Sequence, residues 1–486
     1  MSTNRVILLV LFVVVLIAPL AIHWRMGRAV KHSAPDQLEL IIITAHQEGI
    51  RREFADAFSR YHQKQFGRPV SISYMTFGGS DMVKLFDEKH KTTPGNYGID
   101  LAWGGGDFLF DVQLKKPGYL AQLHLDKPFL DAVFPTPTLS GLPLYDLDPK
   151  NGPAWFGTAL SSFGVVYNRD LLRNLGVPEP KTWRDLADPR LAGWVALADP
   201  TRSASAKQAY MVIVERAMAD AAARGETEDS GWADGMGLIR QIAANARLFT
   251  DSSSVVPIMV SQGEAAAGMS IDFFGRSQAE AVGSDRMGYV EPENATIINP
   301  DPIAMVAGAP HPELAERFIR YVLSPEGQLL WNTKPGAPGG PVSSALRRLP
   351  IRRDSYADMS NFSDQVNPFQ AASSFNKSND RERTYPIIGE LIQASCIDLL
   401  DDLTTTRKLI LTSPRAAALD AQLGRFPFDQ KEAKNRMAKF RAKETTISEK
   451  LSMQRSWSLD FRGEYLKLRN SAADAHRPLS QGRTDP

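Results

Sequence analysis

The sequence predicts an α/β protein of two lobes, and three observations support this fold class. Apolar runs typical of buried strands alternate with helical stretches between residues 38 and 106. The same alternation returns between residues 161 and 331. Together these strands would make one very large sheet, so two lobes joined by crossing strands account for the pattern better.

The first strand is expected at residues 38–46, a continuous apolar run of the kind that parallel sheets bury. In the helix that follows, apolar residues recur at helical spacing with charged residues between them, and a glycine ends it. The apolar positions are Ile50, Phe54, Phe58 and Tyr61, and the glycine is Gly67. We then expect a strand at 69–77, a helix at 78–90 and a strand at 98–106.

The later part of the chain is expected to repeat this order. The predicted elements are a strand and a helix in residues 161–176, a helix and a strand in 180–200, a long helix in 203–225, a helix between strand segments in 248–272, and a strand with two helical stretches in 301–331. The serines that open several of these helices are typical of helix starts.

Composition excludes some partners and some kinds of site. The 486 residues are 43% hydrophobic and 23% charged, which is ordinary for a folded soluble protein. A net charge of +1 provides no overall attraction to nucleic acid or acidic lipid, so no nucleic-acid partner is expected. The single cysteine, Cys396, excludes an internal disulfide and a thiolate cluster for a structural metal.

The N-terminus contains a 17-residue run without a charge, from Val6 to Ile22. Trp24 and Arg25 stand where a signal peptidase requires small residues, so we predict an uncleaved signal anchor in the membrane, with residues 1–35 as anchor and linker. A buried core helix is the alternative. Basic residues flank the run on both sides, so charge leaves the orientation of the anchor open.

The chain changes character after residue 345. The segment that follows is polar and rich in turn residues, and helical patterns return after it. We treat residues 346–486 as a polar segment with a helical extension. Its helices could pack on one of the lobes or contact a partner.

Candidate ligand-binding residues lie where the predicted strands end, because ligands of open α/β sheets bind beyond the carboxyl ends of the strands. Small, hydroxylated and glycine residues recur there, and the amides of helix starts favour anionic groups. The candidates are Thr44, His46, Gly79, Ser80, Ser162, Ser203, Asp272 and Phe273. Strand-to-helix turns, helix caps and a solvated loop histidine are the alternatives for Gly79, Ser203 and His46.

Enzyme signatures are absent from the sequence. It contains no G-x-S-x-G elbow, no H-E-x-x-H zinc helix and no G-x-x-x-x-G-K-[ST] phosphate loop. We therefore predict a protein that is not an enzyme, without a cofactor or a bound metal.

Three stretches resemble the periplasmic solute-binding proteins of ferric-iron-type ABC importers. They are residues 40–83, 155–172 and 299–331, and the resemblance extends over about residues 38–345. It implies a type II periplasmic-binding-protein fold whose two lobes close on a solute. Lobe I would comprise residues 36–160 and 291–345, and lobe II residues 161–290.

The resemblance also implies partners and a location. A receptor of this kind would work as a monomer and deliver its solute to an ABC permease and ATPase. It would lie in the periplasm or on the extracytoplasmic face of the cell membrane, held there by residues 6–22. The resemblance does not extend into residues 346–486.

The same resemblance bears on the identity of the solute. Ferric-binding relatives place adjacent tyrosine ligands where this chain has Phe273 and Phe274, and phenylalanine has no oxygen to offer a hard cation. We therefore expect a small anionic organic solute, such as a phosphonate or sugar phosphate, rather than ferric iron. Asp272 would bind hydroxyls or an amine of this solute and the rings would form an apolar wall, while Arg276 could instead pin a loop by an ion pair.

The sequence thus favours an extracytoplasmic receptor of an ABC importer. A ligand-binding sensor or assembly component of a membrane complex is the alternative, suggested by the predicted anchor and the additional C-terminal helices.

Overall fold

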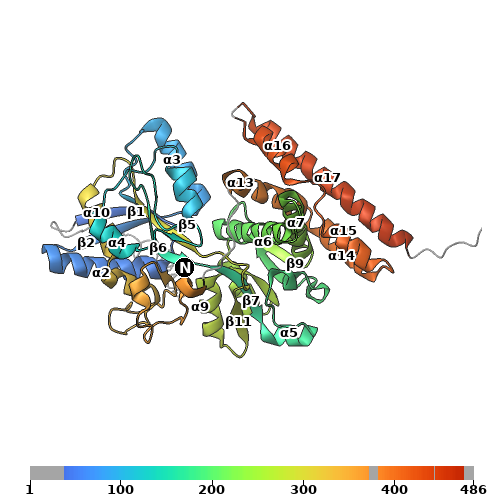
Figure 1. The fold of residues 1–486 in the computed structure, drawn as a ribbon, viewed down its shortest axis with the longest axis horizontal. Coiled ribbons are helices and arrows are strands. Elements are labelled where there is room, and N and C mark those ends of the chain that lie inside the picture. Colours follow the sequence, from blue (N-terminus) through green and yellow to red (C-terminus); the bar gives the residue numbers. More distant parts are fainter. Residues whose placement is uncertain (1–37, 372–380, 443, 476–486) are drawn as a thin grey trace, which may run out of the picture.

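The computed structural model describes residues 38–371, 381–442 and 444–475. Two lobes, each a mixed sheet with helices on its faces, stand side by side, and a group of C-terminal helices packs on the second lobe (Figure 1). The predicted anchor at residues 6–22 lies outside the described residues. Among the helices of the described part, none is both long and apolar enough to cross a membrane.

Lobe I is built on a six-stranded sheet in the order β13-β6-β12-β3-β1-β2. Its strands are β1 (Leu38–Thr44), β2 (Val70–Thr76), β3 (Leu101–Trp103), β6 (Phe156–Ser161), β12 (Asn299–Met305) and β13 (Leu349–Pro350). Strand β1 runs parallel to β2 and β3, and β12 is antiparallel to β3 and β6. The principal helices of the lobe are α2 (Glu48–Phe66), α3 (Gly79–Thr92), α4 (Lys127–Val133), α10 (Pro312–Leu323) and α11 (Pro325–Asn332).

Lobe II is built on a five-stranded sheet in the order β11-β7-β10-β8-β9. Its strands are β7 (Phe163–Asn168), β8 (Val195–Ala198), β9 (Ala246–Thr250), β10 (Ala267–Ile271) and β11 (Met287–Val290). The helices are α5 (Arg169–Leu175), α6 (Ala204–Ala223), α7 (Glu228–Ala243), α8 (Val255–Ser261) and α9 (Asp272–Val282).

The chain passes between the lobes at two places. Strand β6 of lobe I leads into β7 of lobe II through the single residue Ser162, and the segment between Val290 and Asn299 leads back. Both lie beside the boundaries predicted at residues 160 and 290.

The sheet of lobe I extends beyond the boundary predicted at residue 345. Strand β13 pairs with β6, with Leu349 opposite Leu160. Leu349 and Ile351 are apolar residues within an otherwise polar stretch, and both are buried in the core of lobe I. The hydrophobic effect therefore draws this short segment onto the sheet although its surroundings are typical of a surface loop.

The predicted strands of residues 38–106 are present, but β3 is much shorter than expected. The glycines that follow it, Gly104, Gly105 and Gly106, all have positive φ, which ends the extended strand. A side chain at Gly104 would stand 2.9 Å from the ring of His46, and one at Gly105 would stand 2.6 Å from Leu109. These glycines allow the end of β3 to approach the end of β1 closely.

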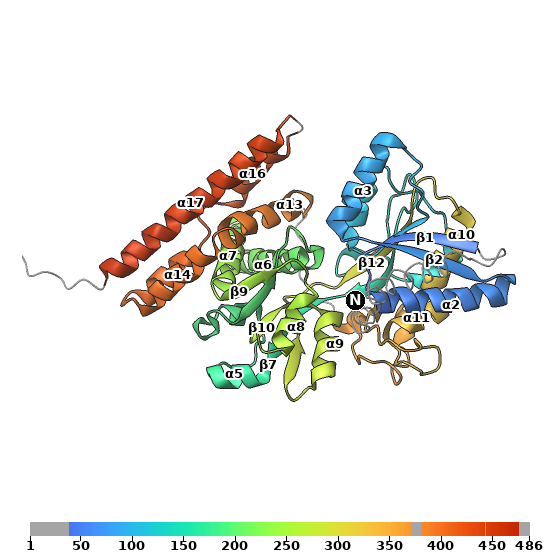
Figure 2. The ribbon, with the colours of Figure 1, turned by 180° about the vertical axis from the view of Figure 1, so that it is seen from behind.

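The C-terminal extension, which we define as the described residues from 381 onward, packs on lobe II rather than standing apart (Figures 1 and 2). Its helices are α13 (Arg381–Ile392), α14 (Leu400–Thr412), α15 (Ala416–Leu423), α16 (Gln430–Arg441) and α17 (Ile447–Asp474). Leu403, Leu419 and Phe461 of the extension share one hydrophobic core with Trp232 and Met236 of α7.

A buried arginine of α7 adds polar contacts to this interface. The guanidinium of Arg240 donates to the carbonyl oxygens of Leu423 and Arg425 and to the carboxylate of Glu464. Cys396 lies nearby, fully buried, and burial raises the pKa of its thiol to about 11. Because polar and apolar contacts combine, the extension is an integral layer of lobe II.

We predict that Gly237→Ala loosens the extension. A β-carbon at this position of α7 would stand 1.7 Å from the carbonyl oxygen of Gly424, so the backbone after α15 would have to move. Overpacking of this kind lowers the free energy of unfolding by about 1 to 3 kcal/mol.

The matched control is Gly463→Ala in α17, where a β-carbon meets nothing within 4 Å. It should raise the stability by about 0.5 to 1 kcal/mol, since alanine is the better helix former. Urea unfolding of both variants checks the pair. Equal stability of Gly237→Ala and the wild type would contradict the close packing of α7 against the extension.

Candidate ligand-binding site

A cleft lies between the two lobes and holds about 1070 Å³ of space, part of it open to solvent. Both lobes line it, lobe I with the loops that follow β1 and β3, and lobe II with the loops before α6 and α8. Pockets for small organic molecules have similar volumes.

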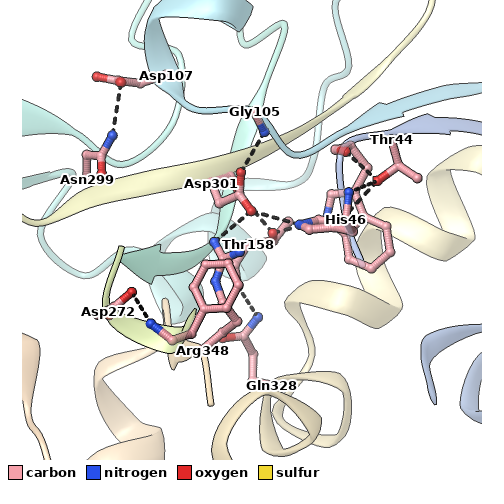
Figure 3. A network of polar contacts seen from close by, with 12 residues as sticks. Thr44, His46, Gly105, Asp107, Thr158, Asp272, Asn299, Asp301, Gln328 and Arg348 are labelled. Atoms are coloured by element: carbon pink, nitrogen blue, oxygen red, sulfur yellow. Dashed lines mark hydrogen bonds and ion pairs between the residues drawn. The ribbon is translucent and has the colours of Figure 1, made fainter. Parts of the chain in front are cut away.

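Three charged or titratable side chains meet at the lobe I wall of the cleft, around the carboxylate of Asp301 (Figure 3). Oδ2 of Asp301 is 2.8 Å from Nε2 of His46 and 2.7 Å from Nη2 of Arg348. Its Oδ1 accepts a hydrogen bond of 2.9 Å from the amide of Gly105. One carboxylate therefore joins the ends of β1 and β3 to the segment just before β13.

The protonation states of this group follow from its burial. Burial disfavours the charge of Asp301, but Arg348 and His46 outweigh it and hold the pKa of the carboxyl well below its usual range. Burial lowers the pKa of His46, an effect that Asp301 opposes. His46 is therefore neutral at pH 7, and because an ionised carboxylate only accepts, Nε2 of His46 carries the ring proton.

The lobe II side presents an aromatic wall. Phe273 and Phe274, at the start of α9, both line the cleft, with ring centroids 4.3 Å apart. The guanidinium carbon of Arg348 lies 4.4 Å from the ring centroid of Phe273, within the range of a cation–π contact. This contact joins the two lobes across the back of the cleft.

Asp272 lies behind that wall, fully buried. Its Oδ1 accepts a 2.8 Å hydrogen bond from the amide of Phe273, and its Oδ2 is 3.5 Å from Nη1 of Arg276. Arg276 also pairs with Glu291. Burial raises the pKa of Asp272 to about 6, although Arg276 opposes the shift.

Three helices begin at the cleft. Gly79 of α3, Ala204 and Ser205 of α6, and Phe273 of α9 are first-turn residues, and all four line it. Helix N-termini carry a partial positive charge and amide donors, so they attract anionic groups. Ser203 caps α6 and Asp272 accepts from the amide of Phe273 in α9, so α3 is the helix of the three whose N-terminus has no side-chain cap.

The charged side chains of the lining largely compensate one another. Arg202 pairs with Asp251 at 2.6 Å, and Asp107 accepts a 3.3 Å hydrogen bond from Asn299. Two buried polar atoms of lining residues, Nε of Arg348 and Oγ of Ser161, have no hydrogen-bond partner within the described part of the chain. A donor on a cation and a hydroxyl are thus left for a ligand to satisfy.

The structure brings half of the predicted site residues to the cleft. His46, Gly79, Ser203 and Phe273 line it. Ser203 also caps α6, since its Oγ accepts from the amide of Ala206, so the cap and the cleft lining coincide. His46 is 5% exposed, which rules out the alternative of a solvated loop histidine.

The other four predicted residues lie outside the lining. Thr44 is fully buried. Its hydroxyl donates to the carbonyl oxygen of Trp103 and contacts the ring of His46. Ser80 borders a second, smaller cavity. Ser162 is buried between β6 and β7, with its neighbour Ser161 facing the cleft instead, and Asp272 is covered by Phe273.

Sequence reasoning missed Asp301 and Arg348. Asp301 stands between two prolines within a buried strand, and a charge in such a strand is a signal that could have been used. Arg348 belongs to a polar, turn-rich stretch in which no pattern distinguishes it from its neighbours.

We predict that Asp272→Asn changes how stability depends on pH. The folded-state pKa of about 6 lies above the unfolded value, so the folded state holds an extra proton between about pH 4 and pH 6. The contribution of Asp272 to the free energy of unfolding is therefore present at low pH. It falls by on the order of 2 to 3 kcal/mol as the pH rises through 6. Asparagine keeps the acceptor for the amide of Phe273 and does not ionise.

Urea unfolding of the wild type and Asp272→Asn at about pH 4.5 and pH 7.5 measures this effect. The stability of the variant relative to the wild type should rise between the two pH values. A constant difference would contradict a raised pKa at Asp272.

Comparisons with known proteins agree with this arrangement. Residues 142–353 match the family described as "Bacterial extracellular solute-binding protein". Over 171 residues the chain is 26% identical to the phosphoglycerate transport regulatory protein PgtC of Salmonella typhimurium and 30% identical to an uncharacterized protein of Haemophilus influenzae. These alignments cover 35% of this chain and only 38% and 44% of the two relatives, less than half of their length.

Solved structures share the fold. The periplasmic binding protein AfuA of Actinobacillus pleuropneumoniae has a TM-score of 0.53 at 18% identity and covers 75% of this chain and 99% of its own. The apo ferric ion-binding protein A of Pasteurella haemolytica has a TM-score of 0.53 at 13% identity, covering 75% and 98%.

The matched family binds solutes and is not catalytic, in line with the prediction from the sequence. The fold prediction is confirmed for the two lobes and the C-terminal helices. Residues 142–353 are thus similar to the bacterial extracellular solute-binding proteins, and the two lobes have the fold of the periplasmic binding proteins.

Proposed function

We propose that this protein is the extracytoplasmic receptor of an ABC importer and that its solute is a small organic anion. The observation that carries the proposal is the convergence of three helix N-termini and the buried Arg348 on one cleft between two lobes. Residues 6–22 would hold the receptor, as a monomer, at the outer face of the cytoplasmic membrane.

The electrostatics of the cleft favour an anion over a cation. Two acidic residues of the lining are paired with arginines, Asp301 with Arg348 and Asp251 with Arg202, while the third, Asp107, accepts a hydrogen bond from Asn299. The N-terminus of α3 has no side-chain cap, whereas Ser203 caps α6 and Asp272 accepts from a first-turn amide of α9. An anionic ligand would bind to amides of these helix starts and to the unpartnered Nε of Arg348.

The cleft suits an organic molecule better than bare ferric iron. Phe273 and Phe274 supply an apolar surface and no oxygen. Across the described residues, no group of three or more His, Cys, Asp and Glu side chains is placed to hold a metal ion. His46 and Asp301 are two potential ligands, and each is already bonded to the other.

The names of two similar proteins support a phosphorylated solute. PgtC is named for phosphoglycerate transport, and the AfuA structure contains fructose-6-phosphate. Both compounds are small and carry a phosphate group, which is the group that helix N-termini and arginine bind well.

The mechanism would require no covalent step. The open form would bind the solute, the lobes would rotate about the connections at Ser162 and residues 291–298, and the permease would recognise the closed form. In this scheme Thr44 orients His46, while Asp272 fixes the start of α9 and the position of Phe273.

A sensor is the second candidate, and two observations favour it. The name of PgtC describes a transport regulatory protein, and the C-terminal extension adds a surface that a membrane partner could read. Adjacent genes for a permease and an ATPase would support import, whereas an adjacent histidine kinase gene would support sensing.

We predict that 3-phosphoglycerate or fructose-6-phosphate stabilises the full chain in mild detergent, whereas fructose and ferric citrate do not. A ligand at one hundred times its dissociation constant adds about 2.7 kcal/mol of stability, which a thermal-shift assay detects. Stabilisation by ferric citrate alone would contradict the proposal of an organic solute.

Ser205→Asp tests the cleft itself. An aspartate in the first turn of α6 suits the helix, but its charge would repel an anion in the cleft, so binding should weaken at least about tenfold. Ser448→Asp places the same change in the first turn of α17, outside the lining, and should leave binding unchanged. Equal binding by the two variants would rule out this cleft.

A further inference from the structure

The longest helix of the C-terminal extension, α17, lies at the outer edge of the molecule (Figures 1 and 2). One face of this helix is buried, and Trp457, Phe461, Tyr465 and Leu468 belong to it. The opposite face is exposed to solvent. A capping box at Thr446 fixes the start of the helix. The protein therefore presents one long and regular helical surface on the side away from lobe I.

Leucines and arginines alternate along the exposed face of α17. Their spacing is three or four residues, so they form one line on the helix, which we call the α17 stripe. The members of the stripe are Leu451, Arg455, Leu459, Arg462 and Leu466. The three leucines are 61%, 55% and 48% exposed. Single apolar side chains occur on any protein surface, but three in one line on one helix form a continuous apolar feature.

The two arginines make the stripe positive. Arg455 is exposed and has no ion pair within the described part of the chain. The guanidinium of Arg462 donates to Asp402 at 3.0 Å, yet its side chain remains 48% exposed. The stripe itself contains no acid, and Asp460 beside it is paired with Arg436. The positive charge of the stripe is therefore available to a partner.

The stripe belongs to a wider local excess of positive charge. Residues 430–469, which include α16 and most of α17, contain eleven Lys and Arg against five Asp and Glu. The whole chain has a net charge of only +1, so the excess is confined to this part of the sequence. A surface that combines this charge with exposed leucines is suited to a partner that is both anionic and apolar.

Charge argues against a second copy of the chain as this partner. A symmetric pair would join the same stripe of two copies, and the arginines of both would meet without an acid between them. A lipid surface fits the alternation, because leucines can enter the acyl boundary while guanidiniums stay at the phosphates. The apolar run Val6–Ile22, predicted to be an anchor, would keep the chain at such a surface.

We propose that the α17 stripe docks on the anionic surface of a membrane. The leucines insert among the lipid headgroups and the arginines bind lipid phosphates, with α17 lying along the membrane rather than crossing it. Among the described helices, α17 included, none is long and apolar enough to cross. Together with the predicted anchor, this contact orients the extension and lobe II, which share one core, relative to the membrane. It requires neither a solute nor a permease.

The test attaches a polarity-sensitive fluorophore beside the stripe of the full chain in lipid vesicles. Ser452→Cys is the attachment site, because Ser452 is exposed and follows Leu451, whereas Cys396 is buried and does not compete for the label. Emission should shift to shorter wavelength in vesicles that contain phosphatidylglycerol and not in vesicles of phosphatidylcholine alone. High salt should reverse the shift. The same fluorophore at Lys64→Cys, on α2 of lobe I, should show no shift.

Three variants locate the contact through the ratio of docked to free α17, taken from the emission spectrum. Leu459→Ser should lower this ratio at least about tenfold, since an inserted leucine is lost. Arg455→Gln should lower it about fivefold, since a basic residue near an anionic surface is removed. Lys467→Gln is the matched control, because it removes one charge from an exposed residue of the same helix outside the stripe. Its ratio should stay close to that of the wild type.

Two outcomes would overturn the proposal. Equal emission in the two kinds of vesicle would exclude the membrane and leave an acidic protein as the occupant of the stripe. An equal loss in Arg455→Gln and Lys467→Gln would show that the attraction belongs to the general charge of the extension and not to the stripe. Neither outcome affects the receptor proposal, which is tested by solute binding in detergent.

Discussion

The buried ion pair between Asp301 and Arg348 is the contact on which the cleft depends. Asp301 also accepts from His46 and Gly105, and its carbonyl oxygen accepts from Thr158, so one residue fixes the ends of β1 and β3 and the strand β6. Through the ring of Phe273, Arg348 extends this network to lobe II. A buried ion pair stabilises the fold only while both side chains are present, because removing one of them leaves the other charge desolvated and unpaired.

The two lobes divide the lining of the cleft between them. Lobe I contributes the ion pair and the start of α3, while lobe II contributes α6, α9 and the aromatic wall. The extension is fixed to lobe II by a shared core and by Arg240, so it would move with that lobe in any closure.

The alternation of strands and helices predicted the lobes because hydrophobic periodicity is a local property of the sequence. The same reasoning placed candidates at strand ends, and there it succeeded only in part. Thr44 and Asp272 follow the rule in position, but their side chains turn toward the protein interior, and Ser161 rather than Ser162 faces the cleft. Successive side chains of a strand point to opposite faces, so a prediction that is wrong by one residue selects a side chain on the other face. Arg348 acts through a contact 47 residues distant along the chain, which no local pattern encodes.

Cys396 gives the docked extension a chemical reporter. It is the single cysteine of the chain, and the hydroxyl of Tyr465 bonds the carbonyl oxygen of its neighbour Ser395, so α17 holds this segment closed. Thiol reagents attack the thiolate, and a fully buried sulfur with a pKa of about 11 supplies almost none. Each modification event in the native protein therefore records a local opening at this position. The rate of modification measures the free energy of that opening without an engineered label.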